Sequence, residues 1–174
     1  MDIEKYDAVD FGSTEDLKDF LHVDITWSRA VAWSDFNPGK EQFIYAIIND
    51  HKNRKNGPEI QYIGITEDGR ARFKKGDYEE KLSIGSYTKI STGVISSSRM
   101  RKLKNKRRDA LEEIEHIFIW ALCDRNYLHN YDKQSTLPGW GRNGTEAYHI
   151  INHGFRFWNR MPREIIYPWA LVKR

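Results

Sequence analysis

The feature that most constrains the fold is a pair of strand-like segments separated by a polar connection. Residues 41–49 (EQFIYAIIN) and 59–66 (EIQYIGIT) are rich in aromatic and β-branched residues, which favour strands. Residues 50–58 between them are polar and close with the letters NGP, a combination typical of turns. The sequence therefore predicts a β-hairpin with a long basic connection, and the rest of the domain must pack around it.

The segments after the hairpin predict a mixed domain. Residues 89–96 have strand character, whereas residues 67–82 are expected to be only partly helical because glycines interrupt them. Apolar residues recur at helical spacing through residues 109–125, and a second helix is predicted for 145–152, before Gly154. We therefore expect an α+β fold, a small, three-stranded, mainly antiparallel sheet flanked by helices. The expected organisation is an acidic N-terminal extension (1–40), a core (41–130) and a C-terminal extension packed on it (131–174).

Length and composition narrow the class of protein. A chain of 174 residues is long enough to form one domain with its own core. The single cysteine, Cys123, excludes an intramolecular disulfide, and we expect it to be a buried, inert thiol. The longest apolar run, residues 117–123, is far too short to span a bilayer, and the acidic N-terminus does not look like a secretory signal. We therefore expect a cytoplasmic protein without a membrane partner.

The positive charge of the chain is concentrated in one place. The net charge is +3, but residues 1–40 carry nine acidic and four basic residues, which leaves an excess of +8 in residues 41–174. Much of this excess lies in a cluster of basic residues within 99–108. A basic cluster is typical of proteins that bind a polyanion such as nucleic acid, although a solvated helix face would have the same composition. The candidate DNA-binding residues are Arg99, Arg101, Lys102, Lys104, Lys106, Arg107 and Arg108.

Short motifs on the two hairpin strands resemble a known family. Residues 43–45 (FIY) and 62–64 (YIG) are similar to the paired signature of the GIY-YIG nuclease superfamily, with Phe43 in place of the first glycine. Arg72 lies ten residues after Tyr62, at the spacing of the family's catalytic arginine. Glu115, which precedes apolar residues, resembles the family's metal-binding glutamate, and Asn126 or Asn130 could correspond to an asparagine that often follows it.

The resemblance covers roughly residues 41–130 and implies a metal-dependent endonuclease. Its expected catalytic residues here are Tyr45, Tyr62, Arg72 and Glu115, with Glu115 holding one Mg²⁺ or Mn²⁺. The first tyrosine would act as general base or orient the attacking water, and the products would carry 5′-phosphate and 3′-hydroxyl ends. The compact length resembles restriction endonucleases of the family. The expected partner is therefore double-stranded DNA, and a homodimer would allow both strands to be cut.

The chemistry of these residue types supports such a site independently of the resemblance. Hydroxyls of Tyr45 and Tyr62 on neighbouring strands could point to one spot, where nearby cations would lower their pKa from about 10. The guanidinium of Arg72 matches a phosphate bidentately and keeps its charge. A carboxylate such as Glu115 is a hard oxygen ligand that suits Mg²⁺ or Mn²⁺.

Several alternatives remain open within the motif region. Arg70 competes with Arg72, and Glu112 and Glu113 compete with Glu115, beside which His116 could play an auxiliary part. Two departures from the family pattern are Ile65, where a lysine is common, and Gly76, where a histidine or tyrosine is common. The residues that could substitute for these are Lys74, Lys75 and Tyr78. The departures leave a second hypothesis, in which the chain is a catalytically degenerate module that only binds nucleic acid.

The C-terminal segment carries two further signals. Phe157, Trp158 and Arg160 belong to an aromatic and basic stretch that either closes the core or stacks on unpaired bases. His149 and His153 have a spacing that could share a metal on a helix, but no third ligand is well placed in the sequence. We therefore expect no zinc site.

Overall fold

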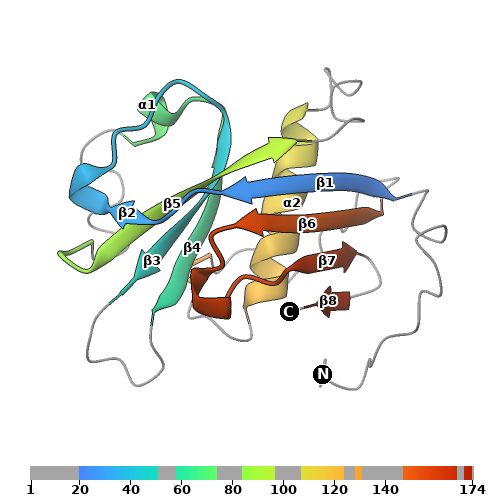
Figure 1. Ribbon diagram of the computed structural model, residues 1–174. Helices are drawn as coiled ribbons and strands as arrows, with labels where there is room; N and C mark the ends of the chain where they lie inside the picture. The colour runs from blue at the N-terminus through green and yellow to red at the C-terminus, as the bar shows by residue number, and fades with distance from the viewer. Residues whose placement is uncertain are drawn as a thin grey trace.

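A single curled sheet forms most of the molecule in the computed structural model (Figure 1). The structure describes residues 20–50, 58–73, 84–96, 107–123, 128–130, 147–167 and 171–173. The strands are β1 (Leu21–Trp27), β2 (Val31–Ala32), β3 (Phe43–Asn49), β4 (Glu59–Thr66), β5 (Thr88–Ser96), β6 (Tyr148–Gly154), β7 (Glu164–Tyr167) and β8 (Leu171–Lys173). The helices are α1 (Gly69–Arg72) and α2 (Arg107–Leu122), with short 3-10 turns η2 (Trp33–Asp35) and η4 (Phe157–Asn159).

The strand order is β4-β3-β5-β1-β6-β7-β8, and β2 pairs with β5 outside this path. All pairs are antiparallel except β1 and β6, which are parallel. The predicted three-stranded sheet flanked by helices is therefore wrong. Strands from before and after the predicted core, β1 and β6, lie side by side in the middle of the sheet. Their pairing joins Leu21 to Tyr148, a separation that no local pattern in the sequence can reveal.

The individual elements agree better with the sequence than the architecture does. Strands β3, β4 and β5 and helix α2 fall where the sequence predicts them. The helix predicted for residues 145–152 is wrong, because residues 148–152 belong to β6. Tyr148, His149 and Ile150 are all buried in this strand. A strand covered on both faces loses the alternation of period two, so a short apolar run there is easily mistaken for a helix.

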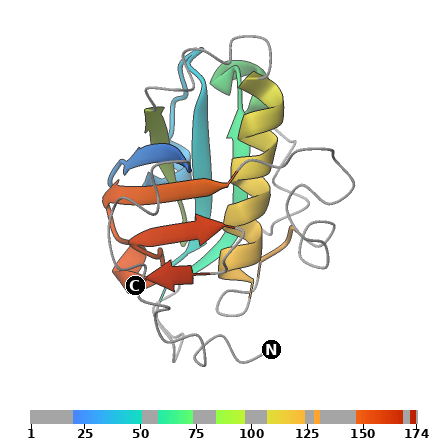
Figure 2. The ribbon, with the colours of Figure 1, turned by 90° about the vertical axis from the view of Figure 1, so that its right-hand side faces the viewer.

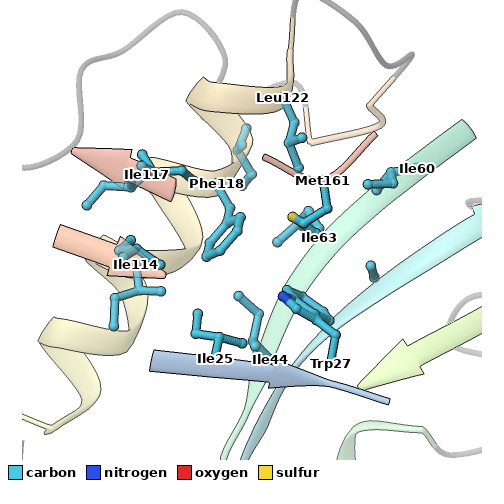
Figure 3. Packing of buried hydrophobic residues seen from close by; sticks show 14 of the residues in the cluster. Ile25, Trp27, Ile44, Ile60, Ile63, Ile114, Ile117, Phe118, Leu122 and Met161 are labelled. Atoms are coloured by element: carbon cyan, nitrogen blue, oxygen red, sulfur yellow. The ribbon is translucent and has the colours of Figure 1, made fainter. Parts of the chain in front are cut away.

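Helix α2 covers one face of the sheet and builds the main core. It crosses behind β1 and β6 in the view of Figure 1 and runs alongside β4 (Figure 2). Phe118 on α2 and Trp27 on β1 are both buried, and their rings meet edge to face with centroids 6.0 Å apart (Figure 3). Burying a side chain of this size stabilises the fold by roughly 1.5–3 kcal/mol. Ile44 on β3 and Ile63 on β4 complete this core, which ties the predicted hairpin to β1.

The opposite face of β3 packs into a second, aromatic cluster. Phe43, Tyr45 and Ile47 alternate with the residues that face α2, and they meet Ile90 of β5 and Phe73 after α1. Because both of its faces are covered, β3 is buried over Phe43–Ile48. In the part of the chain that the structure describes, no helix has the length and apolarity needed to cross a bilayer.

Candidate active site

The hairpin register brings the two motif tyrosines to the same face of the sheet. Tyr45 on β3 pairs with Gly64 on β4, and Ile47 pairs with Tyr62. Side chains at alternate positions of a strand share a face, so Tyr62 and Gly64 lie on the side of Tyr45. The two tyrosine rings are nearly parallel, with centroids 6.1 Å apart and 22° between their planes.

Gly64 provides the space in which the Tyr45 hydroxyl lies. A Cβ atom built on Gly64 would collide with the Cζ and Oη atoms of Tyr45 and would lie 2.8 Å from Cε1 of Tyr62. Tyr45 itself is fully buried. The last letter of the YIG motif therefore has a physical reason, because only glycine lets the Tyr45 ring cross this point of β4.

A short helical turn after β4 positions Arg72. The Asp68 carboxylate caps α1 by accepting a hydrogen bond from the Ala71 amide at 3.1 Å. Phe73, which follows α1, packs edge to face on Tyr45 with centroids 4.8 Å apart. Held at both ends, α1 directs the Nε of Arg72 to the Tyr45 hydroxyl, to which it donates a hydrogen bond of 3.2 Å.

Tyr62 is the residue whose ionisation the three other predicted catalytic side chains affect. Burial raises its pKa above the ordinary value of 10.0, and the negative charge of Glu115 raises it further. The positive charge of Arg72 and hydrogen bonds donated by Arg72 and Tyr45 act in the opposite direction, but they do not outweigh burial. The expectation that nearby cations lower the tyrosine pKa is therefore wrong for Tyr62, although Arg72 does act in that sense.

The three glutamates of α2 have different surroundings. Glu113 accepts a hydrogen bond of 2.5 Å from the Tyr148 hydroxyl, which ties it to β6. Glu115 is half-buried, and its charge acts on Tyr62. Glu112 and His116 are also half-buried on this helix. Of the three candidate carboxylates, Glu115 is thus the one whose charge affects the pKa of Tyr62.

A single carboxylate suits one kind of metal better than another. Among the described residues, no three His, Cys, Asp or Glu side chains gather around a common point. Zinc requires three or four protein ligands, whereas Mg²⁺ retains several waters and is bound through one or two carboxylates together with substrate phosphates. If Glu115 holds a metal ion, its single carboxylate suits Mg²⁺ or Mn²⁺, which would keep waters or share substrate oxygens, better than zinc.

Asn130 lies close to the motif strands, where its side chain forms hydrogen bonds with the backbone of β4. Its side-chain Oδ1 accepts a hydrogen bond from the Ile63 amide (3.1 Å), and its Nδ2 donates one to the Ile63 carbonyl (2.7 Å). The amide of His129 donates to the carbonyl of Gln61 at 2.7 Å. Residues 128–130 thus cover the outer edge of β4, which is the edge strand of the sheet.

The remaining predicted residues fall into two groups. Arg70 is exposed on α1, and Ile65 packs partly against the main core. Arg107 and Arg108 form the first turn of α2. Outside the described residues lie Lys74, Lys75, Gly76, Tyr78, Asn126, Arg99, Arg101, Lys102, Lys104 and Lys106.

The two histidines of the C-terminal segment, His149 and His153, contact different residues and do not share a site. His149 contacts His22 and an oxygen of Glu164, whereas His153 contacts Asp24 at 2.8 Å. Sequence reasoning missed the contact of His149 with His22, because it predicted a helix for this segment. The signal that could have found β1 is its strict alternation of apolar and polar residues, LHVDITW.

Comparison of the chain with known protein families, with curated proteins and with solved structures finds no match.

Proposed function

We propose that this protein is a metal-dependent endonuclease that hydrolyses DNA phosphodiester bonds and leaves 5′-phosphate and 3′-hydroxyl ends. The observation that carries the proposal is that Arg72 donates a hydrogen bond to Tyr45, whose ring lies nearly parallel to that of Tyr62. The charges of Arg72 and Glu115, which come from two different helices, both affect the ionisation of Tyr62. A positive group, a carboxylate and a hydroxyl at one place are what phosphodiester hydrolysis needs to hold a phosphate, a cation and a water.

Burial assigns different parts to the two tyrosines. Tyr45 is fully buried, and its hydroxyl lies over Gly64 with Arg72 donating to it. Tyr62 is half-buried and can therefore meet a water molecule or a substrate. We assign the contact with the attacking water to Tyr62, and we assign to Tyr45 the positioning of Arg72 and Tyr62.

The charges of the site fit an incoming phosphate. Arg72 is exposed, and its guanidinium suits the oxygens of a phosphodiester. Glu115 would hold the divalent ion, which when bound supplies positive charge to the leaving oxygen and offsets the carboxylate charge beside Tyr62. Because its pKa is raised, the Tyr62 hydroxyl keeps its proton at neutral pH. Tyr62 therefore orients the water as a hydrogen-bond partner, because burial, the largest cause of its raised pKa, does not depend on the charge of Glu115.

The proposal is tested with supercoiled plasmid and Mg²⁺ or Mn²⁺. The wild type should nick the plasmid, and Glu115→Gln should lower the rate by about 100-fold or more, a loss typical of removing a catalytic electrostatic group. Glu112→Gln on the same helix is the matched control and should keep the wild-type rate. If the wild type cleaves neither modified nor unmodified DNA with either ion, the proposal is wrong.

Two observations favour the alternative of a module that binds nucleic acid without cleaving it. The family's common lysine is replaced by Ile65, which packs partly against the core, and the hydroxyl of Tyr45 is enclosed. A pure binding module would retain DNA on a filter or gel without product, and Glu115→Gln would not change its behaviour. Double-stranded DNA as substrate, a homodimer and a cytoplasmic location belong to the same proposal and remain predictions.

A further inference from the structure

The turn between β6 and β7 has an unusual backbone. Three consecutive residues with side chains, Phe157, Trp158 and Asn159, have φ angles of 49°, 54° and 66°. This left-handed region is disfavoured for any residue with a Cβ atom, and runs of such residues are rare. Where a fold maintains such a conformation, the surroundings must impose it, and the strain often marks a functional segment.

The surroundings of Phe157 account for how the turn is held. Its ring is fully buried and meets the Trp27 ring edge to face at 5.1 Å. The Asn152 side chain accepts a hydrogen bond from Trp27 Nε1 (2.9 Å) and donates one to the Pro162 carbonyl (3.0 Å). Both ends of the turn are therefore fixed to the main core.

The core does not account for Trp158. Its side chain is 46% exposed although it occupies the middle of the strained turn. One edge of the indole meets Phe155, with centroids 5.2 Å apart, and the Nζ of Lys89 lies 5.9 Å from the ring centre. The turn thus holds a large aromatic ring at the surface in contact with Phe155 and Lys89, where its burial contributes little to stability.

The segment that carries the ring has charged side chains of one sign. Residues 154–163 contain Arg156, Arg160 and Arg163 and no acidic residue. Neither the Arg156 nor the Arg163 guanidinium pairs with a carboxylate in the part of the chain that the structure describes. Rigid aromatic rings combined with cationic side chains are the usual elements of sites that stack unpaired bases and hold the adjoining phosphates.

We propose that the turn of residues 155–163 binds an unpaired base of a nucleic-acid strand, with Trp158 stacking on the base and the arginines facing its phosphates. The inference rests on the proposed function only in taking nucleic acid as the ligand. The tyrosine pair of β3 and β4 takes no part in it. Because every base has an aromatic face, we expect binding to depend on single-strandedness and little on sequence.

The test measures binding of a fluorescently labelled single-stranded dT oligonucleotide and of the matched duplex, in EDTA so that no cleavage occurs. Trp158→Gly should bind the single strand about tenfold more weakly, since stacking on an aromatic residue contributes about that factor or more per base. Duplex binding should not change. The melting temperature of Trp158→Gly should be unchanged or higher, because glycine adopts the left-handed backbone without strain.

Asn159→Gly is the matched control. It relieves the same backbone strain in the next residue and leaves the indole in place, so its binding should equal that of the wild type. An abasic strand of equal length should bind the wild type as weakly as dT binds Trp158→Gly. The inference is overturned if the wild type does not bind the single strand, if Trp158→Gly binds it as the wild type does, or if Trp158→Gly lowers the melting temperature.

The outcome is separable from that of the proposed function. Cleavage that depends on Glu115, together with binding that does not depend on Trp158, would overturn this inference alone. Binding that depends on Trp158 in a protein that cleaves no DNA would overturn the proposed endonuclease alone.

Discussion

Two clusters of polar side chains lie on the sheet, and they differ in what they leave open. The first, the tyrosine cluster, consists of Tyr45, Tyr62 and Arg72 on β3, β4 and α1. The second, the histidine cluster, consists of His22, His149 and Glu164 on β1, β6 and β7. Both combine titratable groups from distant parts of the chain, so convergence alone does not distinguish them.

In the histidine cluster, the central residue His149 finds its hydrogen-bond partners within the cluster. The Nδ1 of His149 lies 3.0 Å from the Nδ1 of His22, its Nε2 contacts a Glu164 oxygen, and the residue is only 8% exposed. Both ring nitrogens of His149 are thus occupied within the sheet. In the tyrosine cluster, by contrast, Arg72 is exposed and Tyr62 is half-buried. His22 is exposed as well, so the two clusters differ at their central residue. His149 is buried with both ring nitrogens in contact and joins strands, whereas Tyr62 still faces outward in part.

The largest effect is expected from Gly64→Ala, which breaks the tyrosine cluster. The added methyl group would collide with Tyr45 and press on Tyr62. Overpacking of this kind costs about 1–3 kcal/mol in the free energy of unfolding. We also expect loss of plasmid cleavage, because the Tyr45 ring must move away from Arg72. Urea denaturation and the nicking assay measure the two effects.

Gly93→Ala is the control for this prediction. Its methyl group would lie 2.7 Å from Cγ2 of Ile44 and 2.8 Å from Cγ2 of Ile25, in the main core. It should lower stability comparably but leave the tyrosines in place, so cleavage by the folded fraction should persist. Equal loss of cleavage in both variants would mean that the space above Gly64 has no special role.

A smaller effect is expected from Glu164→Gln, which tests the other side of the comparison. The substitution keeps the shape of the side chain but removes the charge that faces His149. Loss of one charged hydrogen bond should lower the free energy of unfolding by about 1–2 kcal/mol. Plasmid cleavage should not change. A selective loss of cleavage would show that the histidine cluster takes part in the reaction and that the distinction drawn above is wrong.

The sequence predicts the tyrosine half of the molecule because its determinants are local. The β4 segment has the predicted range 59–66, since its apolar and β-branched residues follow directly on a turn. Tyr62 and Arg72 are separated only by the end of a strand and one helical turn, so the family-like pattern can be recognised within a few neighbouring residues. The reason for Gly64 becomes visible only when its partner Tyr45 is known.

The histidine half could not be predicted because its determinants are distant. His22 meets His149 only through the parallel pairing of β1 with β6. The direction of the Tyr62 pKa was likewise missed, since burial of the ring depends on how α2 and the sheet pack, and burial is its largest cause. Asn130 was expected near catalysis, but its amide matches the exposed edge of β4, a fact that requires the strand order.

The smallest effect is expected in alkaline solution and concerns Tyr62. Burial also raises the pKa of Tyr167, which adds to the same decline in every variant. The pKa of Tyr62 is raised in the folded protein, whereas in the unfolded chain a tyrosine ionises near 10. Below pH 10 the hydroxyl is protonated in both states, and the stability is fully present. As the pH rises above 10, the unfolded chain releases its proton first, so the free energy of unfolding falls until the folded pKa is passed.

Tyr62→Phe should therefore make the decline of stability above pH 10 less steep, as measured by urea denaturation between pH 9 and pH 11. Glu115→Gln should have the same sense and a smaller size, because it removes only the second cause of the shift and leaves burial in place. Glu164→Gln should leave the slope as in the wild type, since the histidine cluster does not act on Tyr62. If Glu115→Gln leaves the slope unchanged while Tyr62→Phe reduces it, Glu115 does not act on the tyrosine, and the carboxylate of the proposed site must be sought elsewhere on α2.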